Sequence, residues 1–515
     1  MALKPESLDP TAIFVAAGAG DWLVVLPLVI CLSAGASLVM LRSRLSAQPL
    51  LAIMALGLLV LVDAALLMRV AAEGPQTMVM GRWLPPFGIA FSVDLTGAIL
   101  NLGAALVALA AAFHSLSDVD AGSRRYGFYP FLMLLMAGVS GAFLTGDIFN
   151  LYVWFEVLLI SSFGLLVLGG RRAQLDGAIK YGLLNLVATT LFLIATGYLY
   201  AIFGTLNMAD ITIKARTMAD SAPLVTLASL YLMAFGMKAA AFPLNFWLPA
   251  SYHTPSITVS ALFSGVLTKV GIYALLRTLV MIFPAARSDL APLIGAIAIA
   301  TMMFGALGAL GQQDIRRLVG QLVISGIGLM LAGLALSTEK ALGATLFYAL
   351  HSMAVMAGLF VMAGLAGKAG GSFSLHRLSG LWLSSPLFSA LTLVLVLSVS
   401  SLPPFSGFWP KAVLVGEALD AGRGWLAAAI LASGFITTLA TGRMFLLVFW
   451  RSIEGETPPQ PIRTATLLPL AALCLPLVAL GLWPEPVLAL ANQAAGGLLD
   501  PAPYLQSVFG GGKLQ

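Results

Sequence analysis

Four ionisable residues lie in stretches of the sequence that are otherwise apolar. They are Glu156, Lys238, Lys269 and Lys411. If these stretches cross a membrane, each charge costs about 2.5 kcal/mol or more on insertion scales. Ionisable residues at that depth are rare and usually mark the path of an ion or a proton. We therefore expect these four side chains to carry the chemistry of the protein.

The residue types indicate a proton relay. Burial favours the neutral form of a lysine, whereas a nearby carboxylate favours the charged form. Glu156 is the acid at a plausible depth to partner Lys238, so separating the two side chains would release a proton. Lys269 could then accept that proton. The alternative is a static buried ion pair that only fixes the packing of the helices.

Two histidines could extend this relay. His351 lies in the middle of an apolar stretch, between the lysine-bearing halves of the chain. Imidazole changes its charge near neutral pH, which favours a relay role over that of a hydrogen-bonded core residue. His253 follows a predicted span at the inner surface, where it could feed protons into the relay or simply cap the turn.

The composition places these residues in a polytopic membrane protein. Of the 515 residues, 60% are hydrophobic and only 10% are charged, and the mean hydropathy is +0.98. Soluble domains have about 25% charged residues. The apolar residues form repeated blocks of about 20, which is the length of a membrane-spanning helix. A β-barrel would show short alternating segments instead, so that fold is excluded.

Several other classes of protein are not expected. The net charge of +5 does not indicate nucleic-acid binding, because Lys and Arg lie mostly between the apolar blocks. The sequence has no metal-ligand spacing, no nucleotide-binding loop and no Ser–His–Asp pattern in a suitable context. We therefore expect no metal, no cofactor and no covalent enzyme. The N-terminus lacks the features of a secretory signal, so we expect it to belong to the mature chain.

The apolar blocks predict an all-α protein with about 14 transmembrane helices. Residues 74–88 are expected to form a surface loop. Asp94, Asp147 and Asp314 lie near the ends of spans, where we expect structural roles at helix termini. The predicted spans are 22–41, 49–70, 91–113, 128–146, 148–168, 177–203, 223–249, 256–283, 290–311, 316–336, 341–366, 384–416, 424–450 and 464–490.

Two of these spans contain several prolines and are expected to be broken within the membrane. The seventh carries Pro243 and Pro249, and the twelfth carries Pro403, Pro404 and Pro410. Proline removes a backbone donor and frees a carbonyl, which is tolerated only where the backbone faces protein or water. The two proline segments are similar in sequence, and a lysine lies close to each. Such a pair indicates an inverted repeat, unless the similarity is accidental.

Lysine and arginine in the connections predict the orientation in the membrane. With the N-terminus outside, the inner connections hold about 14 of these residues and the outer ones about ten. An even number of spans then puts both termini on the outer side.

The residues around the buried charges resemble a known family. The stretch Gly146–Ser162, which contains Glu156, is similar to the fifth helix of the D subunits of Mrp-type multisubunit Na⁺/H⁺ antiporters. Phe235–Ala239, Leu267–Gly271 and Ser401–Lys411 resemble the same proteins. The similarity runs over most of the chain. The wider family of antiporter-like subunits includes the proton-pumping membrane arm of respiratory complex I.

This resemblance implies two inverted five-helix repeats with helices seven and twelve broken. It also implies that Glu156 and Lys238 are the coupling pair, and that Lys269, His351 and Lys411 form the relay toward the exit side. The chain would divide into residues 1–127 with helices one to three, 128–283 with the first repeat, 284–450 with the second repeat, and 451–515 with helix fourteen and a tail.

The resemblance further implies a multisubunit complex in the inner membrane of a bacterium. The expected partners are subunits of the A, B, C, E, F and G types, Na⁺, H⁺ and lipid, but no nucleic acid. Lys411 favours the D type, because M-type subunits of complex I have a glutamate there. The alternatives are a proton-pumping subunit of a redox-driven complex, such as complex I or a membrane-bound hydrogenase, and a non-conducting scaffold subunit. The sequence shows no acidic cluster that could hold Na⁺.

Overall fold

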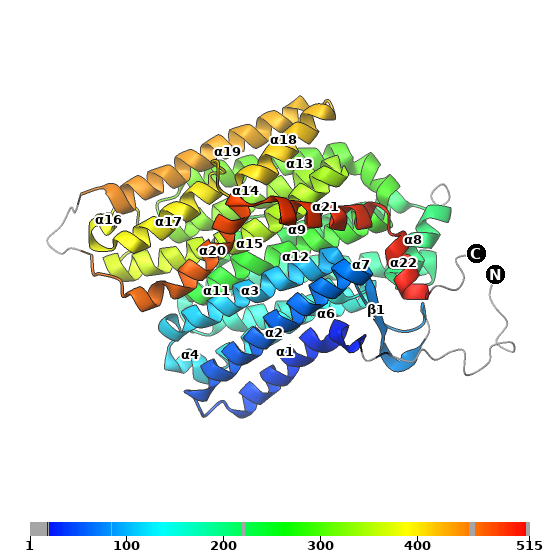
Figure 1. Cartoon of the computed structure of the whole chain (residues 1–515), viewed down its shortest axis with the longest axis horizontal. Helices are drawn as coiled ribbons and strands as arrows, with labels where there is room; N and C mark the ends of the chain where they lie inside the picture. The colour runs from blue at the N-terminus through cyan, green and yellow to red at the C-terminus, as the bar shows by residue number, and fades with distance from the viewer. Residues whose placement is uncertain (1–17, 19, 84, 219–221, 453–458, 511–515) are drawn as a thin grey trace.

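The computed structural model describes residues 18, 20–83, 85–218, 222–452 and 459–510. Figure 1 shows a bundle in which most helices run roughly side by side along the long axis of the molecule. Helices are the expected form for these apolar blocks, because a helix satisfies its backbone hydrogen bonds within the segment and needs no water. The prediction of an all-α polytopic membrane protein is confirmed, apart from one small hairpin.

Eleven helices in the described part of the chain are long and apolar enough to cross a membrane. Three shorter apolar helices accompany them, namely α5 (Phe128–Leu144), α9 (Leu224–Ala239) and α17 (Pro386–Val399). The number of about 14 crossings stays a prediction. The long helices are α1 (Trp22–Met40), α2 (Ala47–Glu73), α3 (Leu95–Asp118), α6 (Ile148–Val167), α7 (Arg172–Phe203), the continuous helix from α11 to η5 (Ile257–Ile282), α13 (Pro284–Gly311), α14 (Ile315–Leu336), α15 (Glu339–Gly370), α19 with η6 (Gly424–Trp450) and η7 with α20 (Thr464–Leu482).

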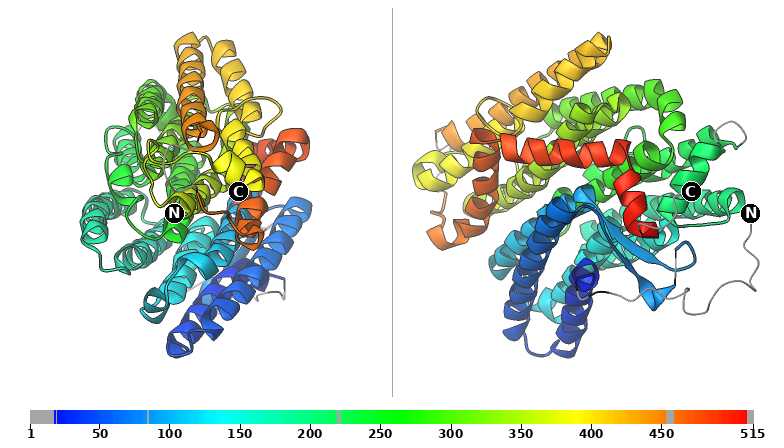
Figure 2. Two further views of the ribbon diagram at one scale, coloured as in Figure 1. Left: turned by 90° about the vertical axis from the view of Figure 1, so that its left-hand side faces the viewer. Right: turned by 45° about the vertical axis from the view of Figure 1, so that its right-hand side comes forward.

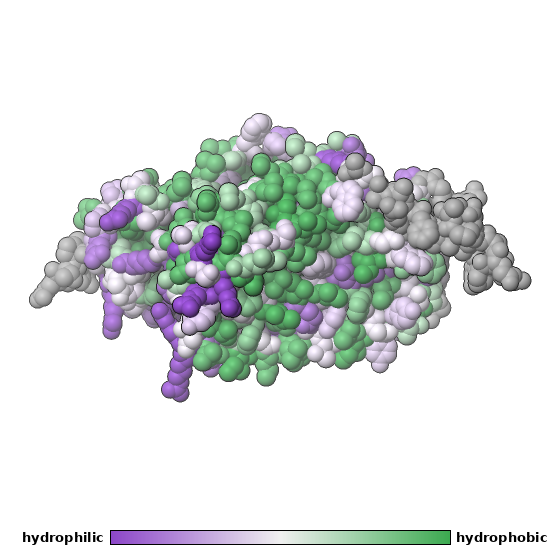
Figure 3. Space-filling model, turned by 90° about the horizontal axis from the view of Figure 1, so that it is seen from below, coloured by the Kyte–Doolittle hydropathy of each residue, from purple (hydrophilic) through white to green (hydrophobic). Residues whose placement is uncertain are grey.

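The bundle has a buried centre and an apolar outside. The α11–η5 helix and α14 are completely buried in their most apolar windows, and α15 is almost so. By contrast, α1, α2, α7, α13 and α19 leave more than half of their windows unburied. Hydrophobic residues dominate the middle of the surface in Figure 3, and hydrophilic residues gather toward its left-hand end. An apolar outer surface of this kind suits contact with lipid.

Both predicted breaks are present. The first break, residues 240–246, separates α9 from the short helix α10 (Trp247–Ser251). The second break, residues 400–407, separates α17 from α18 (Phe408–Asp420). Each break contains a non-glycine residue with positive φ, Ala240 at 62° and Ser401 at 58°, followed by a cis peptide bond to Pro243 or Pro404. The two breaks therefore share their backbone conformation as well as their sequence pattern.

A second pair of matching features lies at the starts of α6 and α14. Asp147 and Asp314 cap these helices by accepting hydrogen bonds from backbone N–H groups of the first turn. Asp147 forms an isolated bridge with Asn207, and Asp314 forms one with Ser374. The structural roles predicted for both aspartates are confirmed. The matching pairs favour an inverted repeat, which stays a prediction.

The structure corrects three predicted boundaries. Residues 76–79 form strand β1 (Gln76–Val79), which pairs antiparallel with β2 (Ala90–Val93), where a loop and the start of a helix were expected. Helix α3 begins only at Leu95, because Asp94 caps it by accepting a hydrogen bond from the Gly97 backbone. The last predicted span stops at Leu482, before a proline that cannot continue the helical hydrogen bonds, and α21 (Glu485–Leu499) follows.

The hairpin marks one end of the bundle. Helix α22 (Ala502–Phe509) and the start of α1 lie beside β1, and α8 (Met208–Thr217) is close by. We call this the hairpin end. The opposite end carries α4 (Ala121–Arg125) and α16 (Leu381–Ser384). Figure 1 and the right-hand view of Figure 2 show that α1 begins and α22 finishes toward the hairpin end.

Helices α13 and α14 pack closely because glycines face the opposite backbone. A Cβ atom on Gly328 of α14 would lie 2.4 Å from the Met302 backbone nitrogen. A Cβ atom on Gly305 of α13 would lie 2.3 Å from the Ser325 backbone nitrogen. Both distances are shorter than any normal van der Waals contact, so a side chain at either position must push the helices apart.

We therefore expect Gly328→Leu to lower the stability of the protein by about 1–3 kcal/mol, the usual cost of overpacking. Thermal unfolding of the detergent-solubilised protein measures this effect. Gly57→Leu is the matched control, because a Cβ atom on Gly57 of α2 meets no atom within 4 Å. Equal melting temperatures of the two variants would contradict the packing argument.

Candidate functional site

Lys238 lies in the last turn of α9, directly before the first break, and its side chain is buried. Its Nζ atom is 5.6 Å from the centroid of the Phe155 ring. Phe155 in turn packs against Phe192 and Phe235, with ring centroids 5.7 Å apart in each case. An aromatic face attracts a cation. The charged form of Lys238 is therefore favoured by this ring as well as by any carboxylate.

Glu156 follows Phe155 on α6, and its side chain is partly exposed. Among the described residues, none of the ion pairs joins Glu156 to Lys238. The carboxylate is nevertheless near enough to act electrostatically on the Lys238 ammonium. Glu156 and Lys238, the predicted pair, therefore lie near each other but are not in direct contact.

The first break is built around Lys238. The indole N–H of Trp247, in α10, donates to the carbonyl oxygen of Met237 at 3.1 Å. The same carbonyl also accepts a hydrogen bond from the Ala240 backbone N–H at 3.1 Å, so the indole of α10 fastens onto the last turn of α9. The α11–η5 helix also approaches here, since a Cβ atom on Gly271 would lie 2.8 Å from the Ala239 backbone nitrogen.

Lys269 lies on the α11–η5 helix and is fully buried, with 0% of its surface exposed. Its ammonium donates to the carbonyl oxygen of Ser264 at 2.6 Å. Ser264 belongs to η4 (Phe263–Leu267), a π-helical segment. Such segments widen a helix and disturb its regular hydrogen bonds, often at functional sites. The carbonyl of Ser264 gives the lysine a neutral acceptor in place of a carboxylate.

His351 connects the middle of the bundle to the second break. It lies on α15 and is fully buried, with 0% exposure. Its Nδ1 atom is hydrogen-bonded to the hydroxyl of Ser406 at 2.9 Å, and its Nε2 atom has no hydrogen-bond partner in the described part of the chain. Both Lys269 and Lys411 act electrostatically on the imidazole. His351 thus lies within the electrostatic reach of two lysines on different helices.

Lys411 lies in the first turn of α18, directly after the second break. It lines a small cavity of about 10 Å³ together with Ser325, Tyr348, Ser433 and Thr437. That volume is about the space of one water molecule. The ring of Tyr348 is 5.3 Å from that of His351. Polar groups therefore extend from His351 toward Lys411.

His253 lies apart from this series, between α10 and the α11–η5 helix. It lines an open cavity of about 590 Å³ that also contains Arg171, Asp314 and Arg317. Its Nδ1 atom is 2.9 Å from the Pro249 carbonyl oxygen, and its Nε2 atom is 3.2 Å from Arg317. Burial and the Arg317 guanidinium lower the pKa of His253 below its ordinary value. Turn capping is visible, and a role in proton uptake stays a prediction.

Three further buried polar groups had no role in the sequence analysis. Asp63 of α2 accepts a hydrogen bond from Asn101 at 2.8 Å. His114 of α3 is hydrogen-bonded to Thr258 at 2.9 Å. Arg277 forms an ion pair with Asp94. Asp63 and Arg277 could have been found by the rule applied to the four charges above, because both lie within predicted spans. Their partners, and the contact of His114, depend on the packing of distant helices. No group of three or more metal-ligating residues occurs among the residues described.

The comparisons with known proteins agree with one another. The family model described as "NADH:quinone oxidoreductase/Mrp antiporter, TM" matches residues 145–437. A protein of Alkalihalophilus pseudofirmus, named as the D subunit of a Na⁺/H⁺ antiporter, is 36% identical over 488 residues, which cover 95% of this chain and 99% of that protein. A Bacillus subtilis protein of the same name is 35% identical, covering 94% of this chain and 99% of the relative.

A solved structure gives the same result. A chain in the structure of the Mrp complex from Dietzia sp. superposes with a TM-score of 0.90 and 29% sequence identity. The superposition covers 96% of this chain and 100% of the other. The sequence relatives and this fold, taken with the family model, show that the chain belongs to the family of Na⁺/H⁺ antiporter D subunits.

Proposed function

We propose that this chain is the proton-translocating subunit of a multisubunit Na⁺/H⁺ antiporter. The observation that carries the proposal is the position of His351, which is fully buried, contacts the second break and lies within the electrostatic reach of Lys269 and Lys411. The names of the relatives from Alkalihalophilus pseudofirmus and Bacillus subtilis support the same function. Subunits of the A, B, C, E, F and G types are the proposed partners, in the inner membrane of a bacterium with both termini outside.

The proposed mechanism begins with Glu156 and Lys238. When the Glu156 carboxylate is close, it stabilises the Lys238 ammonium; when it withdraws, the ammonium loses that stabilisation and passes its proton on. Lys269 is the next acceptor, since Gly271 brings its helix against the end of α9. His351 and water then carry the proton to Lys411. Each step moves one proton between neighbouring basic groups and leaves the donor neutral.

Two other functions remain as alternatives. The description of the family model includes NADH:quinone oxidoreductase, so the same relay could serve a redox-driven complex. In that case the subunits that copurify with the chain would contain redox centres. A non-conducting scaffold is the second alternative, in which the buried charges only hold the helices together.

We expect Glu156→Gln and Lys238→Met to reduce Na⁺-driven proton transport at least about tenfold, because each removes a group that must hold or release the proton. The measurement is proton movement in vesicles that contain the assembled complex. Lys180→Ala is the control, since Lys180 lies on the surface in a pair with Asp176. Transport at the wild-type rate in correctly assembled variants would contradict the proposal.

Lys411→Ala separates the relay from the scaffold. The relay predicts normal assembly with a loss of proton transport, because the last acceptor of the relay is removed. A scaffold predicts the reverse, a loss of subunits from the purified complex with little change in transport per assembled complex. Lys340→Ala serves as the matched control, because Lys340 is an exposed lysine at the start of α15.

A further inference from the structure

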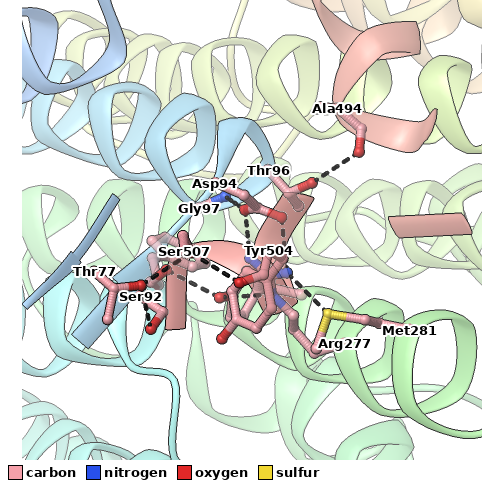
Figure 4. Close-up of polar contacts among 12 residues, drawn as sticks. Thr77, Ser92, Asp94, Thr96, Gly97, Arg277, Met281, Ala494, Tyr504 and Ser507 are labelled. Atoms are coloured by element: carbon pink, nitrogen blue, oxygen red, sulfur yellow. Dashed lines mark hydrogen bonds and ion pairs between the residues drawn. The ribbon is translucent and has the colours of Figure 1, made fainter. Parts of the chain in front are cut away.

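A buried ion pair closes the hairpin end of the α11–η5 helix. Arg277 lies in η5 (Leu276–Ile282), and Asp94 lies at the N-terminus of α3. Their side chains are 1% and 7% exposed. Figure 4 shows the two side chains directed toward each other, with Tyr504 of α22 close to them. The centre of the Arg277 guanidinium is 5.3 Å from the Tyr504 ring.

The hydrogen bonds of this pair engage every nitrogen of the guanidinium and both oxygens of the carboxylate. The guanidinium donates through Nη1 to Asp94 Oδ2 at 2.8 Å, through Nη2 to Asp94 Oδ1, and through Nε to the Tyr273 hydroxyl at 3.0 Å. The Tyr273 hydroxyl in turn donates to the Phe143 carbonyl oxygen at 2.9 Å. Arginine does not release its proton in proteins. The pair is therefore poorly suited to pass a proton on.

The pair lies between Lys269 and an open cavity. Lys269, Tyr273 and Arg277 occupy successive turns of one helix, so about 12 Å of helix axis separates the lysine from the arginine. At the hairpin end, a cavity of about 520 Å³ reaches Asp94 and is also lined by Glu73, Gln493 and Asp500. The pair therefore stands on the Lys269 helix at the side where Asp94 borders this cavity.

A direct route would defeat the relay, because a proton leaving Lys269 toward the cavity would never reach His351. A fixed positive charge raises the energy of an approaching proton, and pores use single arginines as barriers of this kind. The bidentate carboxylate holds the guanidinium in place and lowers the cost of burying it.

We propose that the Arg277–Asp94 pair is an electrostatic barrier that directs protons from Lys269 sideways to His351 and Lys411. This inference rests on the proposed function. Arg277 and Asp94 act as positioning residues for the proton path and carry no proton themselves. The contact with Tyr504 also links the barrier to α22, and α22 is joined to the hairpin by a hydrogen bond of 3.0 Å between Ser507 and Thr77.

The test is the passive proton leak of vesicles that contain the purified complex, measured without Na⁺ under an imposed pH gradient. We expect Asp94→Asn combined with Arg277→Gln to leak several-fold faster than the wild type, because both charges are gone while a polar path stays. Arg277→His should also leak, because histidine can pair with Asp94 and still release a proton. Arg277→Lys keeps a positive charge at this position, so we expect its proton leak to equal that of the wild type.

Adding Lys269→Met to the double variant should suppress the leak, because the leaking proton comes through Lys269. A double variant that assembles and leaks protons no faster than the wild type would overturn the proposal. A leak that Lys269→Met leaves unchanged would overturn it as well. Failure of both leak variants to assemble, while Arg277→Lys assembles, would show a purely structural pair and overturn it too. None of these outcomes alters the test of the proposed function, which is the loss of wild-type antiport on Lys238→Met.

Discussion

Every buried charge and every freed backbone group in this protein must find its partner inside the chain, because hydrocarbon provides none. The structure shows how several of these groups meet this requirement. The Lys269 ammonium donates to the Ser264 carbonyl of a π-helical segment, and the Trp247 indole donates to Met237 beside the first break. Arg277 has a bidentate carboxylate. Each of these contacts holds a polar group deep in the protein, and none of them is an ion pair with a lysine of the proposed relay.

The two breaks place these groups in relation to each other. The first ends α9 directly after Lys238, and the second brings Ser406 into contact with His351. The fully buried α11–η5 helix and α15 lie at the centre of the bundle and carry Lys269 and His351. The middle of the proposed relay, Lys269 and His351, therefore lies in the most protected part of the molecule. Its exposed helices offer apolar surfaces to lipid or to partner subunits.

The buried charges and both breaks could be predicted because each is signalled by single residues: an ionisable side chain in an apolar block, or clustered prolines. The hairpin could not, since strands β1 and β2 are only four residues long and are held by pairing with each other. The last span was predicted to run to residue 490, too far, because the apolar pattern continues across the interruption at Trp483 and Pro484. The Arg277–Asp94 pair joins residues 183 positions apart, so only the tertiary structure shows it.

The central claim is that a proton passes from Lys269 to Lys411 through His351. The most direct measurement is Na⁺-driven proton transport in vesicles containing the complex with His351→Ala, compared with the wild type at equal subunit content. The account predicts that transport is largely lost while the complex stays assembled. Transport at the wild-type rate would contradict it, because the proton would then reach Lys411 without the imidazole that lies within the electrostatic reach of both lysines.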